Sequence, residues 1–300
     1  MLVISWWYAR RVPIAPVIMS WHESWQEART LLTLGISFMG AALASTATAY
    51  AILTLLIRKF GLAEVGIYQA AYSLSGVLVG FVLGAMGADY YPRLTAVAGD
   101  NASVYRMVNE QSQIAILLAL PGLAAMMIFA PLVIHLFYAS SFAAAVPILR
   151  WCILGILGRV LSWPLGFVML AKGKGKLFLI TEVFACVLHL VGVFVFIHLW
   201  GLKGAGIAFM ALYVIYTALM VLVMRMLVGA TWTRHTLDMT LIASTVMALL
   251  MLNCTFNNYL IVAWPINLSI LAAVTFLCLK QLAKKSDIGL QALLTRVGMK

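Results

Sequence analysis

The chain has 300 residues, of which 64% are hydrophobic and 10% charged, and its formal net charge is +11. Soluble domains carry about 25% charged residues, so this chain has too little polar surface to cover a water-soluble globule. The composition therefore indicates an all-α integral membrane protein. The basic residues stand in short breaks between apolar runs rather than on one solvated face, so we expect no nucleic-acid partner.

The N-terminal segment MLVISWWYARRVPI runs from apolar through aromatic to basic. A signal peptide has its positive residues first. The order found here is that of a transmembrane helix leaving the membrane at its cytoplasmic face, with Trp6, Trp7 and Tyr8 as aromatic belt and Arg10 and Arg11 as anchor. Too few residues precede this belt to span a bilayer, so we expect the chain to begin in the middle of a longer protein.

An amphipathic stripe follows within residues 1–33. Apolar residues recur there at three- and four-residue steps, and polar residues lie largely off that stripe, which consists of Ile18, Trp21, Trp25, Ala28 and Leu32. The pattern predicts a helix that lies in the cytoplasmic membrane interface before the first span.

Eight apolar stretches are long enough to cross a membrane as helices. They are residues 34–57, 66–88, 113–134, 148–170, 177–199, 204–227, 239–256 and 260–279. The seventh is the weakest, because asparagines crowd its end. We expect residues 34–230 to form a six-helix lobe, 231–280 an additional two-helix hairpin and 281–300 a basic cytoplasmic tail. About eight transmembrane helices are thus predicted.

A cytoplasmic segment is expected between the second and third spans. Pro92 is expected to end the preceding helix, and Asp100 or Asn101 to cap a new one that lies along the cytoplasmic surface.

The basic residues predict the orientation of the spans. Of the twenty Lys and Arg residues, fifteen fall on the side that holds the N-terminal segment, every second loop and the C-terminal tail. The opposite side holds Arg58, Lys59, Lys203 and, at a helix mouth, Arg150. Because cytoplasmic loops are enriched in Lys and Arg, both termini of this multi-pass protein are predicted to be cytoplasmic.

Two patterns concern the inner faces of the spans. Gly76, Gly80 and Gly84 stand at four-residue steps in the second span, which predicts close approach of a neighbouring helix. The first span carries GAALASTATAY, where Ser45, Thr46, Thr48 and Tyr50 either line a wet path or hydrogen-bond their own backbone.

Arg159 is the charged residue that the apolar pattern does not explain. It stands about 16 Å from each end of its span, close to the centre of the bilayer. A charge there costs from about 3 to more than 10 kcal/mol, so it faces a partner or a water-filled cavity. Glu182, Cys186 and His189 share one face of the next span. Arg159 either pairs with Glu182 to lock the hairpin or lines a cavity for an anionic substrate, and Glu182 could orient it there.

His189 is expected to be a satisfied polar residue rather than a proton carrier. The sequence shows no acidic metal-binding cluster, no nucleophile set and no phosphate-cradling glycine loop, so we expect no enzyme activity, no metal and no cofactor. The four cysteines lie in or beside apolar runs and are expected to be small buried hydrophobes.

Three stretches carry a family resemblance. The stretch GLAEVGIYQAAYSLSGVLVGFVLGAMGADYYPRL (61–94) resembles the O-antigen translocases, the Wzx-type oligosaccharide flippases of the multidrug/oligosaccharidyl-lipid/polysaccharide exporter (MOP) superfamily. VMLAKGKGKLFLITEV (168–183) and GLKGAGIAFMALYVIY (201–216) resemble two further segments of the family. The resemblance covers roughly residues 1–230.

The resemblance implies a MATE/MOP-like C-terminal lobe that flips an undecaprenyl-diphosphate-linked oligosaccharide, of O-antigen or enterobacterial common antigen type, across the bacterial inner membrane by alternating access. Arg159 fits the basic residue that members carry in the corresponding helix. The cavity candidates are then Arg159, Glu182, His189, Gln69, Tyr72 and Arg58. The partners implied are the anionic lipid-linked oligosaccharide, membrane lipid, and polymerase and chain-length regulator proteins.

The family has about twelve to fourteen spans, so the first lobe is expected to be absent from this chain or supplied as a separate N-terminal lobe. This departure leaves two alternatives open. The chain is a truncated, non-transporting lobe or scaffold in the polysaccharide assembly complex, or it belongs to a cation-coupled exporter of the same superfamily. The second alternative would favour an acidic cavity, whereas Glu182 is the one well-buried acid expected here.

Overall fold

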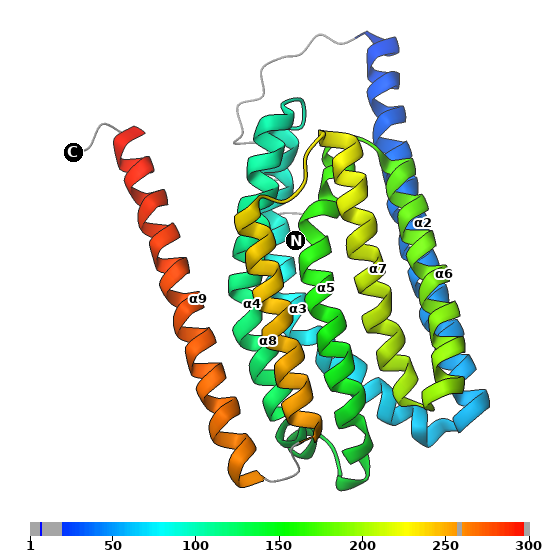
Figure 1. Cartoon of the computed structure of the whole chain (residues 1–300). Helices are drawn as coiled ribbons and strands as arrows, with labels where there is room; N and C mark the ends of the chain where they lie inside the picture. The colour runs from blue at the N-terminus through cyan, green and yellow to red at the C-terminus, as the bar shows by residue number, and fades with distance from the viewer. Residues whose placement is uncertain (1–6, 8–19, 257–259, 297–300) are drawn as a thin grey trace.

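The computed structural model describes residue 7, residues 20–256 and residues 260–296 (Figure 1). The elements are α2 (Trp21–Phe60), α3 (Leu62–Ala96), α4 (Asn101–Phe137), the short 3₁₀ helix η1 (Ser140–Ala144), α5 (Ala145–Ala171), α6 (Gly175–Trp200), α7 (Lys203–Val228), α8 (Arg234–Phe256) and α9 (Leu260–Arg296). No strand occurs in the described residues, which confirms the predicted all-α class. The predicted belt and anchor at residues 6–11 lie outside the described residues apart from Trp7, as do residues 297–300 of the predicted basic tail.

Seven helices in the described part of the chain are long and apolar enough to cross a membrane, which makes this a multi-pass membrane protein. They are Leu32–Phe60, Asn101–Phe137, Ser140–Ala171, Gly175–Trp200, Lys203–Val228, Arg234–Thr255 and Trp264–Lys285, and each overlaps a predicted span. The remaining predicted span, 66–88, falls on α3, where some side chains between residues 78 and 85 lie outside the described part. The cytoplasmic location of both termini stays a prediction.

The predicted interfacial helix and the first span form one helix. α2 runs from Trp21 to Phe60 without a break, because this stretch contains no proline. Trp21 and Trp25, at its start, are 91% and 64% exposed. Exposed tryptophans suit a membrane interface, and the placement of these first turns in that interface stays a prediction.

The prediction that Pro92 ends its helix is wrong. α3 continues through Pro92 to Ala96. Proline removes one N–H from the helix but leaves the next turn able to form, and there the Thr95 hydroxyl donates to the Tyr91 carbonyl at 2.9 Å. α4 then begins at Asn101 and runs directly into the third predicted span, so it is not a separate surface helix.

The predicted cap of α4 is confirmed at Asp100. Its carboxylate accepts hydrogen bonds from the N–H groups of Ala102 at 3.0 Å and Ser103 at 3.3 Å. Hydrogen bonds from Ser103 and Ala102 hold the pKa of Asp100 below its usual value of 3.8. A carboxylate with a lowered pKa in the folded state stabilises that state above its unfolded pKa, and the stabilisation is lost as the pH falls through the folded pKa.

We therefore expect Asp100→Ala to lower the apparent melting temperature of the chain in detergent micelles at pH 7. The difference from wild type should shrink as the pH falls from 3.8 through the lower pKa of the folded cap, because the wild-type carboxylate becomes protonated there. Asp100→Asn is the control, since asparagine caps helices as well as aspartate. A loss that is the same at every pH would contradict this account of the cap.

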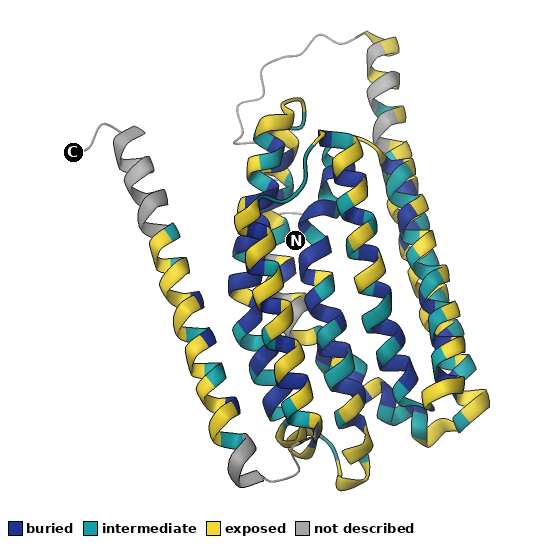
Figure 2. Cartoon of the chain, in the orientation of Figure 1, coloured by how far each residue is buried: buried dark blue, intermediate teal, exposed yellow. Residues whose placement is uncertain are grey.

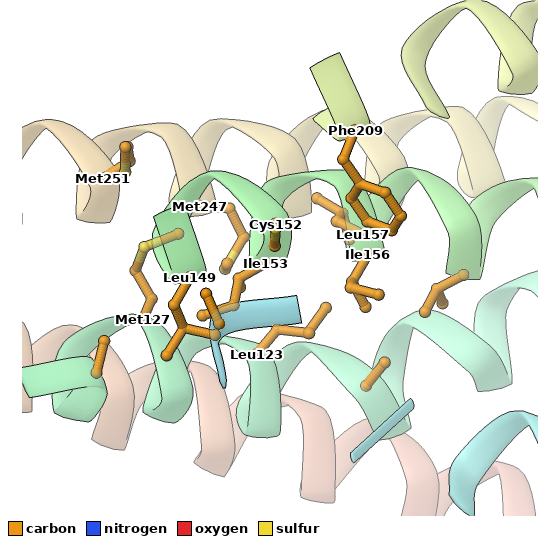
Figure 3. Packing of buried hydrophobic residues seen from close by; sticks show 14 of the residues in the cluster. Leu123, Met127, Leu149, Cys152, Ile153, Ile156, Leu157, Phe209, Met247 and Met251 are labelled. Carbon is orange, nitrogen blue, oxygen red and sulfur yellow. The ribbon is translucent and has the colours of Figure 1, made fainter. Parts of the chain in front are cut away.

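Helix α5 lies at the centre of the bundle, in contact with α3, α4, α6, α7 and α8. Figure 3 shows Leu149 and Ile153 of α5 packed with Leu123 and Met127 of α4. Buried residues gather on α4, α5 and α7, whereas α9 and the outer sides of α2 and α6 are largely exposed (Figure 2). In a bilayer such exposed apolar sides face lipid. Because α5 lies inside the bundle, a charge on it must be explained by its neighbours there.

Glycines let the central helices approach closely, but not the glycines that the sequence pattern selected. A Cβ added at Gly155 of α5 would lie 2.5 Å from the Cδ1 atom of Phe209 on α7. A Cβ at Gly206 of α7 would lie 2.9 Å from the Ile148 carbonyl oxygen of α5. The α5–α7 contact therefore depends on small residues on both helices.

The prediction that the glycine row of α3 packs against a helix is wrong for this chain. A Cβ at Gly76, Gly80 or Gly84 would meet no atom of the described residues within 4 Å. The pattern of small residues is local, whereas the partner helix is chosen by the whole bundle, and here α3 turns this row toward open space.

A buried hydrogen-bond network attaches α8 and α9 to α4. The Oδ1 atom of Asn109 accepts from the N–H of Thr233 at 2.7 Å and from the Thr236 hydroxyl at 2.9 Å. Gln113, one turn further along α4, donates to the same hydroxyl at 2.9 Å and accepts from Lys285 Nζ at 2.6 Å. The two C-terminal helices are thus held on the side of α4, away from α2 and α6 (Figure 1).

Candidate functional site

Arg159 is the one exposed residue between Ile148 and Ala171 of α5, a range that is fully described. No Asp or Glu oxygen of the described residues lies within 4.0 Å of its guanidinium. The ion pair with Glu182, one of the two alternatives for Arg159, is therefore not formed. A charge in mid-membrane is tolerated where it meets a partner or a cavity, and Arg159 meets a cavity.

We call this space the arginine cavity. It has a volume of about 270 Å³ and lies between α2, α5, α6 and α7. Its lining includes Arg159, Trp163 and Phe167 of α5, Phe38 of α2, and Phe178 and Glu182 of α6. Arg159, Trp163 and Phe167 follow one another at four-residue steps, which places them on one face of α5. The cavity thus offers one guanidinium flanked by aromatic rings.

Glu182 is held by a tyrosine instead of by the arginine. The Tyr216 hydroxyl of α7 donates a hydrogen bond to Glu182 Oε1 at 2.5 Å. This charge-assisted bond satisfies part of the carboxylate and fixes its position. Because Tyr216 holds Glu182, the Arg159 guanidinium keeps its donors free for a ligand.

A second space, the polar cavity, adjoins the first. It has a volume of about 390 Å³, and the two cavities share Glu182 and Tyr213. The polar side chains that line it are Ser45 and Thr48 of α2, Gln69, Tyr72 and Ser73 of α3, and Cys186 and His189 of α6. Four of the six candidate residues, Gln69, Tyr72, Glu182 and His189, therefore meet in this cavity, with Arg159 next to it.

The expectation that His189 is a satisfied polar residue is wrong. Its Nε2 atom is buried and has no hydrogen-bond partner among the described residues. The imidazole packs near the Phe209 ring, with ring centroids 5.8 Å apart. The imidazole lacks a partner because an apolar side chain of α7 packs near it. The sequence of α6 alone does not show which residues of α7 lie there. A buried polar atom on a cavity wall is available to a ligand.

A third space, the glycine cavity, lies on the other side of Arg159. It has a volume of about 310 Å³ and is lined by Gly80, Leu83, Gly84 and Gly87 of α3 together with Arg159, Trp163 and Phe167. Gly80 and Gly84, whose added Cβ atoms would meet no atom of the described residues within 4 Å, thus border the same cavity as the charged residue. Arg159, Trp163 and Phe167 line both this cavity and the arginine cavity.

Two further arginines lie elsewhere. Arg58 is exposed and borders a groove of α2 and α6 that shares no lining residue with the arginine or polar cavity. Arg150, at a helix mouth, donates to the carbonyl of Cys254 at 2.8 Å and to that of Met127 at 3.4 Å. It ties α5 to α4 and α8, because the Met127 carbonyl lacks a helical partner four residues before Pro131 and the Cys254 carbonyl lies in the last turn of α8.

The hydroxyl-rich stretch of the first span divides in two. Ser45 and Thr48 line the polar cavity, as one of the two alternatives predicts. Thr46 is exposed and does not line it, and Tyr50 is 67% exposed on another face of α2. A helix presents successive residues about 100° apart, so four neighbours cannot share one wall.

The six aromatic residues that line the arginine cavity were missed from the sequence. Tyr213 and Tyr216 line the arginine cavity from α7, and Trp163 lines it from α5. A signal was present, because Phe209, Tyr213 and Tyr216 recur at four- and three-residue steps. That signal marks one face of a helix without showing that the face meets Glu182.

Comparisons with known proteins fit this architecture. Residues 1–147 match the family model of a polysaccharide biosynthesis protein. The chain is 25% identical over 169 residues to the Lipid III flippase of Escherichia coli K12, a match that covers 55% of this chain and 39% of the relative. The Lipid III flippase of Shigella flexneri matches to the same extent.

A solved structure shares the fold. The Lipid II flippase MurJ in its inward closed conformation superposes with a TM-score of 0.57 at 14% sequence identity, covering 82% of this chain and 52% of that protein. The chain thus spans about two fifths of the matched relatives and about half of this structure. The family match, the two relatives and the shared fold agree with the resemblance in the sequence, and together they support a polysaccharide or lipid-linked flippase of the MOP superfamily.

Proposed function

We propose that this chain takes part in moving a polyprenyl-diphosphate-linked oligosaccharide across the bacterial inner membrane, with Arg159 as the contact for the diphosphate. The observation that carries the proposal is the unpaired, exposed guanidinium in the middle of the otherwise buried α5. Diphosphate carries negative charge on neighbouring oxygens, and the planar guanidinium fork matches two of them at once.

The surrounding residues support this assignment. Glu182 is engaged by Tyr216 and forms no ion pair with Arg159, so the guanidinium has no carboxylate partner among the described residues. The polar cavity adjoins the arginine cavity and supplies hydroxyl, amide and imidazole groups that suit a glycan. Exposed apolar helix sides offer the lipid tail a path in the bilayer. Movement of this bundle against a partner lobe would expose the site to each side in turn. An O-antigen or enterobacterial common antigen substrate fits the resemblance in the sequence, and polymerase and chain-length regulator proteins are the partners proposed with it.

Binding of undecaprenyl diphosphate to the purified chain in nanodiscs tests the proposal. We expect Arg159→Ala to weaken binding about tenfold or more, because a charge-assisted hydrogen bond contributes about 1.5–3 kcal/mol. Arg159→Lys should restore part of the affinity, since lysine keeps the charge without the fork. Undecaprenol, which lacks the diphosphate, should bind equally weakly to all three proteins.

Arg58→Ala is the matched control, because it removes one arginine that lies outside the arginine cavity. Equal affinities of wild type and Arg159→Ala would remove Arg159 from the site, as would an equal loss in Arg58→Ala. Translocation of the lipid-linked oligosaccharide in proteoliposomes then separates two roles. Binding without translocation would favour the alternative of a non-transporting lobe or scaffold.

A further inference from the structure

Trp163 lies beside Arg159 and has no role in the proposed contact with the diphosphate. It lies one helical turn from Arg159 on the same face of α5, about 6 Å along the helix axis. Both residues line the arginine cavity and also the glycine cavity. The indole is therefore within reach of a ligand that the guanidinium holds in either space.

The indole is fixed by its neighbours on three sides. Phe167 packs against it with ring centroids 4.5 Å apart, and Tyr90 of α3 lies 5.9 Å away. Tyr90 is itself held in place, since its hydroxyl donates to the Pro164 carbonyl at 3.0 Å. Gly87 admits the indole edge, because a Cβ there would lie 3.1 Å from Trp163 Cζ2. Trp163 is nonetheless only half-buried, and its free surface borders the two cavities.

We propose that Trp163 is the platform on which the first sugar of the lipid-linked substrate stacks while Arg159 holds the diphosphate. This inference rests on the proposed function. A pyranose ring often presents a face of C–H groups with partial positive charge, and the face of an indole carries the negative part of its quadrupole. The first sugar is bonded directly to the diphosphate, so it lies close to the guanidinium that holds the diphosphate. The Trp163 indole also lies close to that guanidinium.

The inference makes Trp163 a specificity residue. A rigid aromatic platform at this depth favours a ring-shaped, glycosylated diphosphate over a bare polyprenyl diphosphate and over ordinary phospholipids. The wild-type chain is therefore expected to bind undecaprenyl-diphosphate–N-acetylglucosamine about fivefold more tightly than undecaprenyl diphosphate. The ratio of these two dissociation constants measures the sugar contact alone.

The test compares this ratio in purified variants in nanodiscs. Trp163→Leu should bring the ratio close to one, and Trp163→Phe should keep most of the ratio. Trp200→Ala is the control, because this exposed tryptophan ends α6 outside the three cavities. If Trp163→Leu keeps the wild-type ratio, the inference is overturned. This includes the case in which the variant loses the same factor of affinity for both ligands.

A second measurement does not depend on the folding of Trp163→Leu. In wild-type chain labelled with 5-fluorotryptophan, the ¹⁹F resonance that is absent from Trp163→Phe belongs to Trp163. We expect the glycosylated ligand to shift this resonance and undecaprenyl diphosphate to leave it nearly in place. Equal shifts with both ligands would overturn the sugar contact. If wild type binds neither ligand, the proposed function itself fails.

Discussion

Gly204→Ala is expected to destabilise the chain by about 3 kcal/mol or more, the largest effect of a single methyl group in this bundle. A Cβ at Gly204 would lie 2.0 Å from the carbonyl oxygen of Phe196 and 2.7 Å from the N atom of Ile197. Both are backbone atoms of α6, so no rotation of a side chain can relieve the overlap. The α6–α7 hairpin must open instead, and it carries Glu182 and Tyr216 on its two helices.

Unfolding by sodium dodecyl sulfate in mixed micelles measures this effect. Gly76→Ala is the control, because a Cβ there meets no atom of the described residues within 4 Å. Both substitutions replace a helical glycine, and the gain of helix propensity is at most about 1 kcal/mol in either, so a larger difference between them reports the backbone contact. Equal stability of the two variants would show that the helices do not approach as described.

Asn109→Ala is expected to cost about 3 kcal/mol, because it leaves buried partners without hydrogen bonds. Asn109 is 3% exposed and accepts from Thr233 and Thr236 while its amide donates to the carbonyls of Tyr105 and Thr231. Alanine leaves the N–H of Thr233 at the start of α8 unpaired. We therefore expect α8 to detach first, with faster amide exchange across residues 231–240.

A double-mutant cycle with Thr236→Val checks this prediction. The two residues share a hydrogen bond of 2.9 Å, so their effects on the free energy of unfolding should deviate from additivity by about 1 kcal/mol. Thr240→Val is the control, because its hydroxyl donates only to the Thr236 carbonyl in its own helix. Additive effects of Asn109→Ala and Thr236→Val would contradict the network.

The sequence by itself determined the membrane class and seven of the spans. Hydropathy is a sum over about 20 consecutive residues, so it needs no knowledge of neighbouring helices. The same local property singled out Arg159, because a charge inside an apolar run is visible without a fold. The Asp100 cap was predictable for a similar reason, since a capping side chain binds backbone within three residues of itself.

Only the tertiary structure decided which residues meet. The sequence alone does not show whether Glu182 meets Arg159 or Tyr216. The packing of α7 against α6 brings it to the tyrosine. The close contacts fall on Gly155, Gly204 and Gly206 rather than on the α3 row, because a glycine spacing describes one helix and close approach needs two. The three cavities around Arg159 are likewise spaces between helices. The walls of the arginine and polar cavities join residues more than a hundred positions apart, and no periodicity along a single helix carries that information.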